Sequence, residues 1–232
     1  MNPAIDYFKY AITVDNVIFG FSKGELNVLL IERGEEPFDK DWALPGYFVK
    51  QDEDLESAAY RVLNELTGLK DVYLEQVHSF GRVDRHPFGR VITVAFYSLI
   101  KIDDYKINAA SIAKNVKWES VNEVLKMSLP FDHREILEAC YTKLRKAVRG
   151  RPVGFELLPP KFTLTELQNL YEAILMPQKL DKRNFRKKIL SMKLLIDLSE
   201  TQEGVAHRPA KLFKFDRDKY KEFVSEGFVF DI

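Results

Sequence analysis

The sequence predicts an α+β protein of two domains, the larger over residues 1–148 and the smaller over residues 162–232, joined by a linker over residues 149–161. Three observations lead to this prediction. Runs of β-branched and aromatic residues, typical of strands, dominate the first part. Glycine and proline cluster between residues 149 and 160, at a density typical of a domain boundary. Two amphipathic helical patterns followed by alternating strand patterns fill the remainder.

The larger domain is expected to contain five strands and two helices. The strands are expected at residues 10–19, 26–33, 72–80, 91–102 and 113–118. A turn at residues 20–24 joins the first two strands as a hairpin. Apolar residues recur at helical spacing over residues 54–66, and again from Asp132 to Arg145. A loop rich in charged residues, 81–90, separates the third strand from the fourth.

The smaller domain is expected to begin with a capping box, in which Thr163 caps a helix and Glu166 stands three residues further on. Pro177 ends this helix, and Asp181 caps a second one. The helices and strands are expected at residues 164–175, 182–192, 194–198 and 210–215. A polar loop over residues 201–208 joins the two strands. Two helices, a short turn and a β-hairpin together make a winged helix-turn-helix.

The composition is that of a soluble globular protein, with 46% hydrophobic and 30% charged residues. Lys+Arg and Asp+Glu each number 35, so a site for nucleic acid must depend on local charge. The single cysteine, Cys140, excludes an internal disulfide and is expected to pack within a helix. Residues 1–6 lack a signal-peptide pattern, and no apolar run is long enough to span a bilayer. We therefore expect a cytoplasmic protein.

Residues 44–69 resemble the Nudix box, the loop–helix–loop with which Nudix hydrolases hold a metal and a nucleoside diphosphate. The family pattern is Gly, five residues, Glu, seven residues, then Arg-Glu-apolar-any-Glu-Glu-any-Gly-apolar. When the pattern is anchored on Arg61 and Gly68, its glycine falls on Tyr47 and its first glutamate on Glu53, which can pair with Arg61. The resemblance implies that the larger domain is a Nudix α/β/α sandwich.

The next three acidic positions of the box fall on Val62, Glu65 and Leu66. Positions three and four residues apart share one face of a helix. Magnesium requires oxygen ligands in near-octahedral order, so Glu65 alone is a poor site. His78 and His86 show no zinc spacing. We therefore expect no metal, no cofactor and no catalysis, and interpret the domain as a Nudix fold reused for binding. The alternatives are an ordinary amphipathic helix after a Pro-Gly turn and a hydrolase with relocated ligands.

The second helix of the smaller domain is the candidate DNA-binding element. Residues 179–193 hold seven basic residues and one acid, a local net charge of +6 that suits phosphates. The DNA-binding candidates are Lys182, Arg183, Asn184, Arg186, Lys187, Lys188 and the wing residues Arg208 and Lys211. The side chains at 183, 184 and 186 could donate to base edges, while those at 187, 188 and in the wing are expected to hold phosphates. A solvated basic face is the alternative.

The whole chain resembles the Nudix-related transcriptional regulators, and it is similar to their sugar-responsive, arabinose-type branch. Residues 162–173 and 181–188 are the most specific parts of the resemblance, which also includes residues 61–68, 80–85 and 154–159. It implies a homodimeric repressor or activator that binds a small effector and a palindromic operator in double-stranded DNA. Two winged helices on a two-fold axis can read half-sites separated by whole helical turns. Residues 154–161 are the candidate element that transmits the effector signal.

The effector-binding candidates are Tyr47, Glu65, Arg82, Asp84, Arg85 and Arg90. Tyr47 narrows the pocket and suits stacking on a sugar face. Because the magnesium ligands are missing as well, a diphosphate has lost its usual anchor, and we expect a pentose such as arabinose. Arg82 and Arg85 could bind a diphosphate without metal, which keeps ADP-ribose or another NAD-derived nucleotide open. A surface ion-pair network in this loop and an active hydrolase of ADP-ribose or sugar nucleotides are further alternatives.

Overall fold

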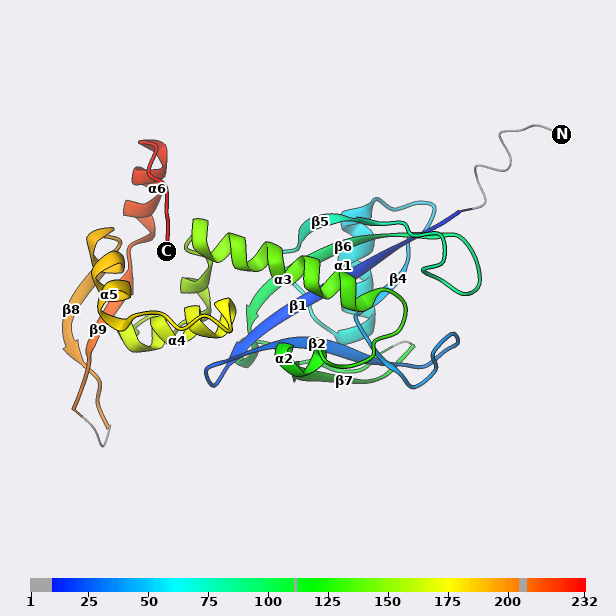
Figure 1. The fold of residues 1–232 in the computed structure, drawn as a ribbon, viewed down its shortest axis with the longest axis horizontal. Coiled ribbons are helices and arrows are strands. Elements are labelled where there is room, and N and C mark those ends of the chain that lie inside the picture. Colours follow the sequence, from blue (N-terminus) through cyan, green and yellow to red (C-terminus); the bar gives the residue numbers. More distant parts are fainter. Residues whose placement is uncertain (1–9, 111, 205–207) are drawn as a thin grey trace. The chain divides into compact units, whose positions relative to one another are not determined.

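The computed structural model describes residues 10–110, 112–204 and 208–232 (Figure 1). These residues form two compact units. The first contains residues 10–22 and 26–143, and the second contains residues 23–25 and 144–232. The expectation for residues 1–6, and part of the polar loop expected at residues 201–208, lie outside the described residues. Within the described residues, no helix is long and apolar enough to cross a bilayer.

Seven strands of the described residues form one mixed sheet in the first unit. They are β1 (Ala11–Ser22), β2 (Glu25–Arg33), β3 (Trp42–Ala43), β4 (Gly46–Phe48), β5 (Glu75–Phe80), β6 (Val91–Lys101) and β7 (Ala113–Ser120). The central strand β1 runs parallel to β6 and antiparallel to β4, and β2 lies beside it. β5 pairs with β6, while β3 and β7 pair with β2. β5 begins three residues later than the expected strand, and the two-residue β3 and three-residue β4 were not predicted.

Two helices, α1 (Leu55–Thr67) and α3 (His133–Gly150), pack on opposite faces of this sheet (Figure 1). Successive residues of a strand point to opposite faces. Ile18 therefore belongs to the core cluster that contains α1, while the ring of Phe19 lies 6.0 Å from that of Tyr141 in α3. The prediction that this helix ends at Arg145 is wrong, because buried Ala147 and Val148 continue its apolar pattern. A short helix, α2 (Val121–Val124), precedes α3, and Ile102–Asp104 form a 3-10 turn.

The α1 helix has a defined cap at each end. The Asp54 side chain accepts a hydrogen bond from the backbone N–H of Ser57 at 2.7 Å, which satisfies one of the donors exposed at a helix start. Gly68 follows the last turn in the left-handed conformation, with φ of 74°, and its N–H bonds to the carbonyl of Asn64. The helix therefore has the position expected from the box.

The second unit contains α4 (Leu164–Leu175), α5 (Lys182–Ser191), β8 (Leu195–Thr201), β9 (Lys211–Phe215) and α6 (Arg217–Ser225). Both halves of the capping box between Thr163 and Glu166 are formed, and Asp181 caps α5 as predicted. A 3-10 turn at Val153–Leu157 precedes α4, and the ring of Phe155 stacks on that of Phe215 at 4.4 Å. The segment within the Gly/Pro-rich stretch is therefore packed against β9. Helix α6 was not predicted, although Asp216 caps it by accepting from the N–H of Lys219.

Candidate functional site

The box helix presents a hydrophobic face where a hydrolase would present carboxylates. Val62 and Leu66 are 0% and 2% exposed and belong to the core of the first unit. Glu65 lies outside this core and accepts a hydrogen bond from Arg61 at 2.9 Å. Within the described residues there is no group of three or more His, Cys, Asp or Glu side chains that could hold a metal ion. The donor set at the box therefore does not fit magnesium.

The predicted pair between Glu53 and Arg61 is confirmed. Arg61 donates from Nε to Glu53 at 2.8 Å and from a terminal nitrogen to the carbonyl of Phe48 at 2.9 Å, so it ties the helix to the end of β4. The hydrogen bond from Arg61 lowers the pKa of Glu53 to about 2, with a further contribution from the backbone N–H of Lys50. These residues keep the loop in shape without needing a metal.

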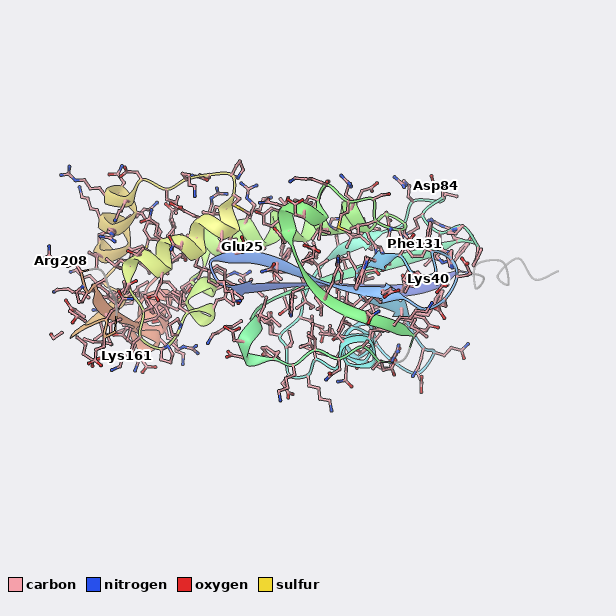
Figure 2. All side chains as sticks on the ribbon, turned by 90° about the horizontal axis from the view of Figure 1, so that it is seen from below. Glu25, Lys40, Asp84, Phe131, Lys161 and Arg208 are labelled. Carbon is pink, nitrogen blue, oxygen red and sulfur yellow. The ribbon has the colours of Figure 1, made fainter. Side chains whose placement is uncertain are left out.

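A cleft of about 50 Å³ opens beside β1 and β4, and aromatic rings form its walls. Its aromatic lining residues are Tyr47, Phe48, His86 and Phe131. The rings of His86 and Phe131 stack at 5.2 Å with an angle of 11° between their planes, and the Arg33 guanidinium lies 5.1 Å from the Phe131 centroid. Phe131 and Asp84 lie toward the same end of the first unit (Figure 2). Burial, followed by the charges of Arg85 and Arg33, lowers the pKa of His86.

The floor of the cleft is a buried cluster of charged and polar groups. Asp15, on β1, is 4% exposed and accepts a hydrogen bond from the Thr93 hydroxyl at 2.7 Å. Arg85 binds Asp132 through two hydrogen bonds of 2.9 and 2.7 Å and lies 3.5 Å from Asp15. Burial raises the pKa of Asp15, but His133, Arg85 and Thr93 outweigh it and hold the pKa below its usual range. The carboxylate of Asp15 is therefore ionised at neutral pH.

Gly46 allows β4 to pass close to this floor. A Cβ atom at position 46 would lie 1.9 Å from Oδ1 of Asp15, so any other residue would displace either the strand or the carboxylate. The Pro-Gly entry to the box therefore has a packing role here.

Two of the six predicted effector residues, Tyr47 and Arg85, line the cleft. Arg82 instead pairs with Asp84 at 3.1 Å and Glu135 at 2.8 Å, all three being exposed, so the alternative of a surface ion-pair network describes this part of the loop. Arg90 donates to the carbonyls of Gly81 and Arg82 and braces the same loop. Glu65 pairs with Arg61 away from the cleft.

Most residues that line the cleft were not predicted from the sequence, among them Asp15, Arg33, Phe131 and His133. One signal was available for Asp15, since an acidic residue stands within a strand that is otherwise mostly apolar. A buried carboxylate must find partners, and such positions often serve function. His86 was not among the predicted effector residues, yet its ring forms part of the cleft wall.

The basic face of α5 is exposed to solvent. The exposed candidates are Lys182, Arg183, Asn184, Lys187, Lys188, Arg208 and Lys211, and Figure 2 labels Arg208. Phe185 and Ile189 form the buried side of the helix. Arg186 is partly buried and donates to the Thr165 hydroxyl at 2.9 Å. Two of the exposed lysines have acidic neighbours: Lys188 pairs with Asp231 at 2.8 Å and Lys211 with Asp197 at 3.0 Å.

Comparisons with known proteins match both units. A family model of the NUDIX domain matches residues 9–140, and one of the NrtR DNA-binding winged helix domain matches residues 154–215. A relative from Acinetobacter baylyi, the ADPR responsive transcriptional repressor NtrR, is 37% identical over 93% of this chain and 86% of its own length. The chain belongs to the NrtR family. The predicted fold, a Nudix domain followed by a winged helix domain, is thereby confirmed.

Two solved structures of Shewanella oneidensis NrtR extend the comparison. NrtR complexed with a 27mer DNA has a TM-score of 0.71 and 32% identity, covering 90% of this chain and 95% of that one. The NUDIX domain complexed with ADP ribose has a TM-score of 0.56 and 33% identity, covering 62% of this chain and 94% of that one. These relatives in the NrtR family favour the nucleotide alternative over the expected pentose, and nothing in the comparisons supports the arabinose-type branch.

Proposed function

We propose that this chain is a transcriptional repressor that binds DNA through α5 and the β8–β9 wing, and whose Nudix domain binds ADP-ribose or a closely related nucleotide. The observation that carries the proposal is the likeness, over 93% of the chain, to an ADPR responsive transcriptional repressor. The local charge of α5 supports it, because exposed lysine and arginine side chains neutralise DNA phosphates and release counterions.

We assign the contacts with DNA from the position of each side chain on α5 and in the wing. Arg183 and Asn184 stand exposed in the first turn of α5, where a recognition helix contacts base edges, and we assign them to bases together with Arg186. Lys182, Lys187 and Lys188, with Arg208 and Lys211 in the wing, are assigned to phosphates. A homodimer follows from the small number of bases that one winged helix can read.

The cleft supports a role for the Nudix domain in effector binding. Its aromatic walls suit the flat face of a sugar or base, and Arg33 at the rim brings a positive charge for a phosphate. An effector changes the DNA affinity only if it binds the free and DNA-bound forms unequally. We propose that ADP-ribose favours the free form, and that Tyr47 and Arg85 contribute to its site.

A pentose such as arabinose is the second candidate, and one structural observation favours it. Two carboxylates, Asp15 and Asp132, surround one guanidinium at the floor, so the floor repels a phosphate. The box also lacks two of the carboxylates that would hold magnesium, because Val62 and Leu66 stand at their positions. We therefore propose that the domain does not hydrolyse its effector.

The proposal is tested by DNA binding in the presence of candidate effectors. An operator is first selected from random 30-base-pair duplexes with the full chain, and its affinity is then measured by fluorescence anisotropy. We expect ADP-ribose to lower the operator affinity at least tenfold, while arabinose leaves it unchanged. Release by arabinose and not by ADP-ribose would establish the second candidate. If no duplex is enriched over the starting pool, the assignment of α5 to DNA is wrong.

A further inference from the structure

Of the two buried carboxylates at the floor of the cleft, Asp15 has the more distant charged partners. Arg85 donates to both oxygens of the Asp132 carboxylate, at 2.9 and 2.7 Å, so the charge of Asp132 is paired directly with the guanidinium. Asp15 has Arg85 and His133 as ionisable neighbours, each at 3.5 Å. This second carboxylate, which is 4% exposed, therefore lacks the two short hydrogen bonds that Asp132 receives from a guanidinium.

The ring of His133 is the other neighbour of Asp15 at the floor. The backbone N–H of Leu44 donates to its Nδ1 at 3.1 Å, so this nitrogen acts as a hydrogen-bond acceptor. The hydrogen is then on Nε2, which lies 3.5 Å from Oδ1 of Asp15. The backbone of the box entry thus fixes the tautomer of the ring.

Asp15 also keeps capacity to accept hydrogen bonds. An ionised carboxylate has about four acceptor sites. Oδ2 receives the Thr93 hydroxyl at 2.7 Å, while the nearest donor to Oδ1 among the described contacts is His133 at 3.5 Å, beyond a normal hydrogen bond. Asp15 lines the cleft, and its side chain is 6% exposed.

Neutral hydrogen-bond donors satisfy such a group best. A phosphate would meet a buried like charge, whereas a hydroxyl donates to the carboxylate without adding charge. The stacked rings of His86 and Phe131 stand at the wall of the same cleft, where the apolar face of a sugar ring can pack against them. The cleft therefore pairs an acceptor floor with an aromatic wall.

We propose that Asp15 determines effector specificity by accepting hydrogen bonds from the hydroxyls of a pentose ring that occupies this cleft. The ring is either the terminal ribose of ADP-ribose or a free pentose, and in the first case the pyrophosphate extends toward Arg33 at the rim. The proposal rests on the proposed function of the Nudix domain as an effector sensor.

The test is calorimetric binding of four probes to the full chain: ADP-ribose, ADP, D-ribose and L-arabinose. ADP lacks the terminal ribose, so we expect the wild-type chain to bind ADP-ribose at least tenfold more tightly than ADP. Asp15→Asn should remove most of this difference. A hydrogen bond to a charged acceptor contributes about tenfold more to the binding constant than one to a neutral acceptor. Its affinity for ADP should not change.

The matched control is Asp39→Asn, the same chemical change in an exposed pair with Lys114 that does not line the cleft. It should leave all four affinities within twofold of the wild type. Tight binding of a free pentose that is lost in Asp15→Asn identifies the free sugar as the source of the ring and supports the proposal.

Three outcomes overturn the proposal. Equal binding of ADP-ribose by the wild type and Asp15→Asn removes the specificity role but leaves the proposed function intact. Equal weakening of ADP and ADP-ribose by Asp15→Asn places the nucleotide, not the terminal ribose, on the floor. If the wild type binds none of the four probes, the proposed function fails as well. If Asp15→Asn does not fold, the test is the wild-type preference for ADP-ribose over ADP. Equal wild-type affinities for the two would then be a fourth outcome that overturns the proposal.

Discussion

Replacing Arg85 by methionine tests the charge cluster beneath the cleft. The change removes the guanidinium but keeps a long apolar side chain, and it leaves Asp15 and Asp132 buried without a cation between them. Breaking a buried ion pair by removing one partner typically costs about 3–5 kcal/mol. With a urea dependence of about 2 kcal/mol per molar for a domain of this size, the unfolding midpoint should fall by roughly 2 M.

Tryptophan fluorescence makes this measurement specific to the first unit. The two tryptophans of the chain, Trp42 and Trp118, both lie in that unit, so their emission follows its unfolding and not that of the winged helix domain. Arg82→Met is the matched control. Arg82 is 57% exposed and its partners are exposed too, so its loss should cost less than about 1 kcal/mol. Equal midpoint shifts for the two variants would refute the cluster's role.

Three further predictions concern the box and α5. Because the folded state lowers the pKa of Glu53 from 4.5 to about 2, its stabilising effect is complete above pH 4.5 and is lost toward pH 2. The difference in thermal midpoint between the wild type and Glu53→Gln should therefore shrink below pH 4.5, and a constant difference would contradict the assignment. Arg183→Ala should weaken binding to the selected operator by about 1–3 kcal/mol and relax its sequence preference, whereas Lys187→Ala should weaken all duplexes alike and reduce the salt slope by about 1. Identical anisotropy profiles for these two variants would contradict the division into base and phosphate contacts. The wild-type chain and Glu65→Gln should show equal, background release of AMP from ADP-ribose with magnesium, and turnover that Glu65→Gln abolishes would restore the enzyme alternative.

The elements that local sequence determines were predicted well. Thr163 and Asp181 cap their helices through side-chain contacts only three residues away, and such contacts are visible as spacing in the sequence. The degenerate box was informative for the same reason, since its pattern is contained in one short loop–helix–loop segment of the chain. Helix α6 was missed even though Asp216 provides a similar signal at its start.

The cleft was hard to predict because its parts come from distant segments. Asp15 and Thr93 are 78 residues apart in the sequence, and Arg85 and Asp132 are 47 apart. No local spacing relates these residues, and the loop around Arg85 contains two other arginines, Arg82 and Arg90, that do not line the cleft. Only the packing of β1, β6 and the start of α3 distinguishes Arg85, which is buried, from Arg82, which is exposed.

The central claim is that an effector in the Nudix domain controls DNA binding by the winged helix domain. The most direct measurement is the affinity of the full chain for its selected operator as ADP-ribose is titrated at constant salt. The account predicts a saturable loss of affinity, at least tenfold, with a midpoint that matches the calorimetric affinity for ADP-ribose. An operator affinity that stays constant while calorimetry shows the Nudix domain saturated with ADP-ribose would contradict it.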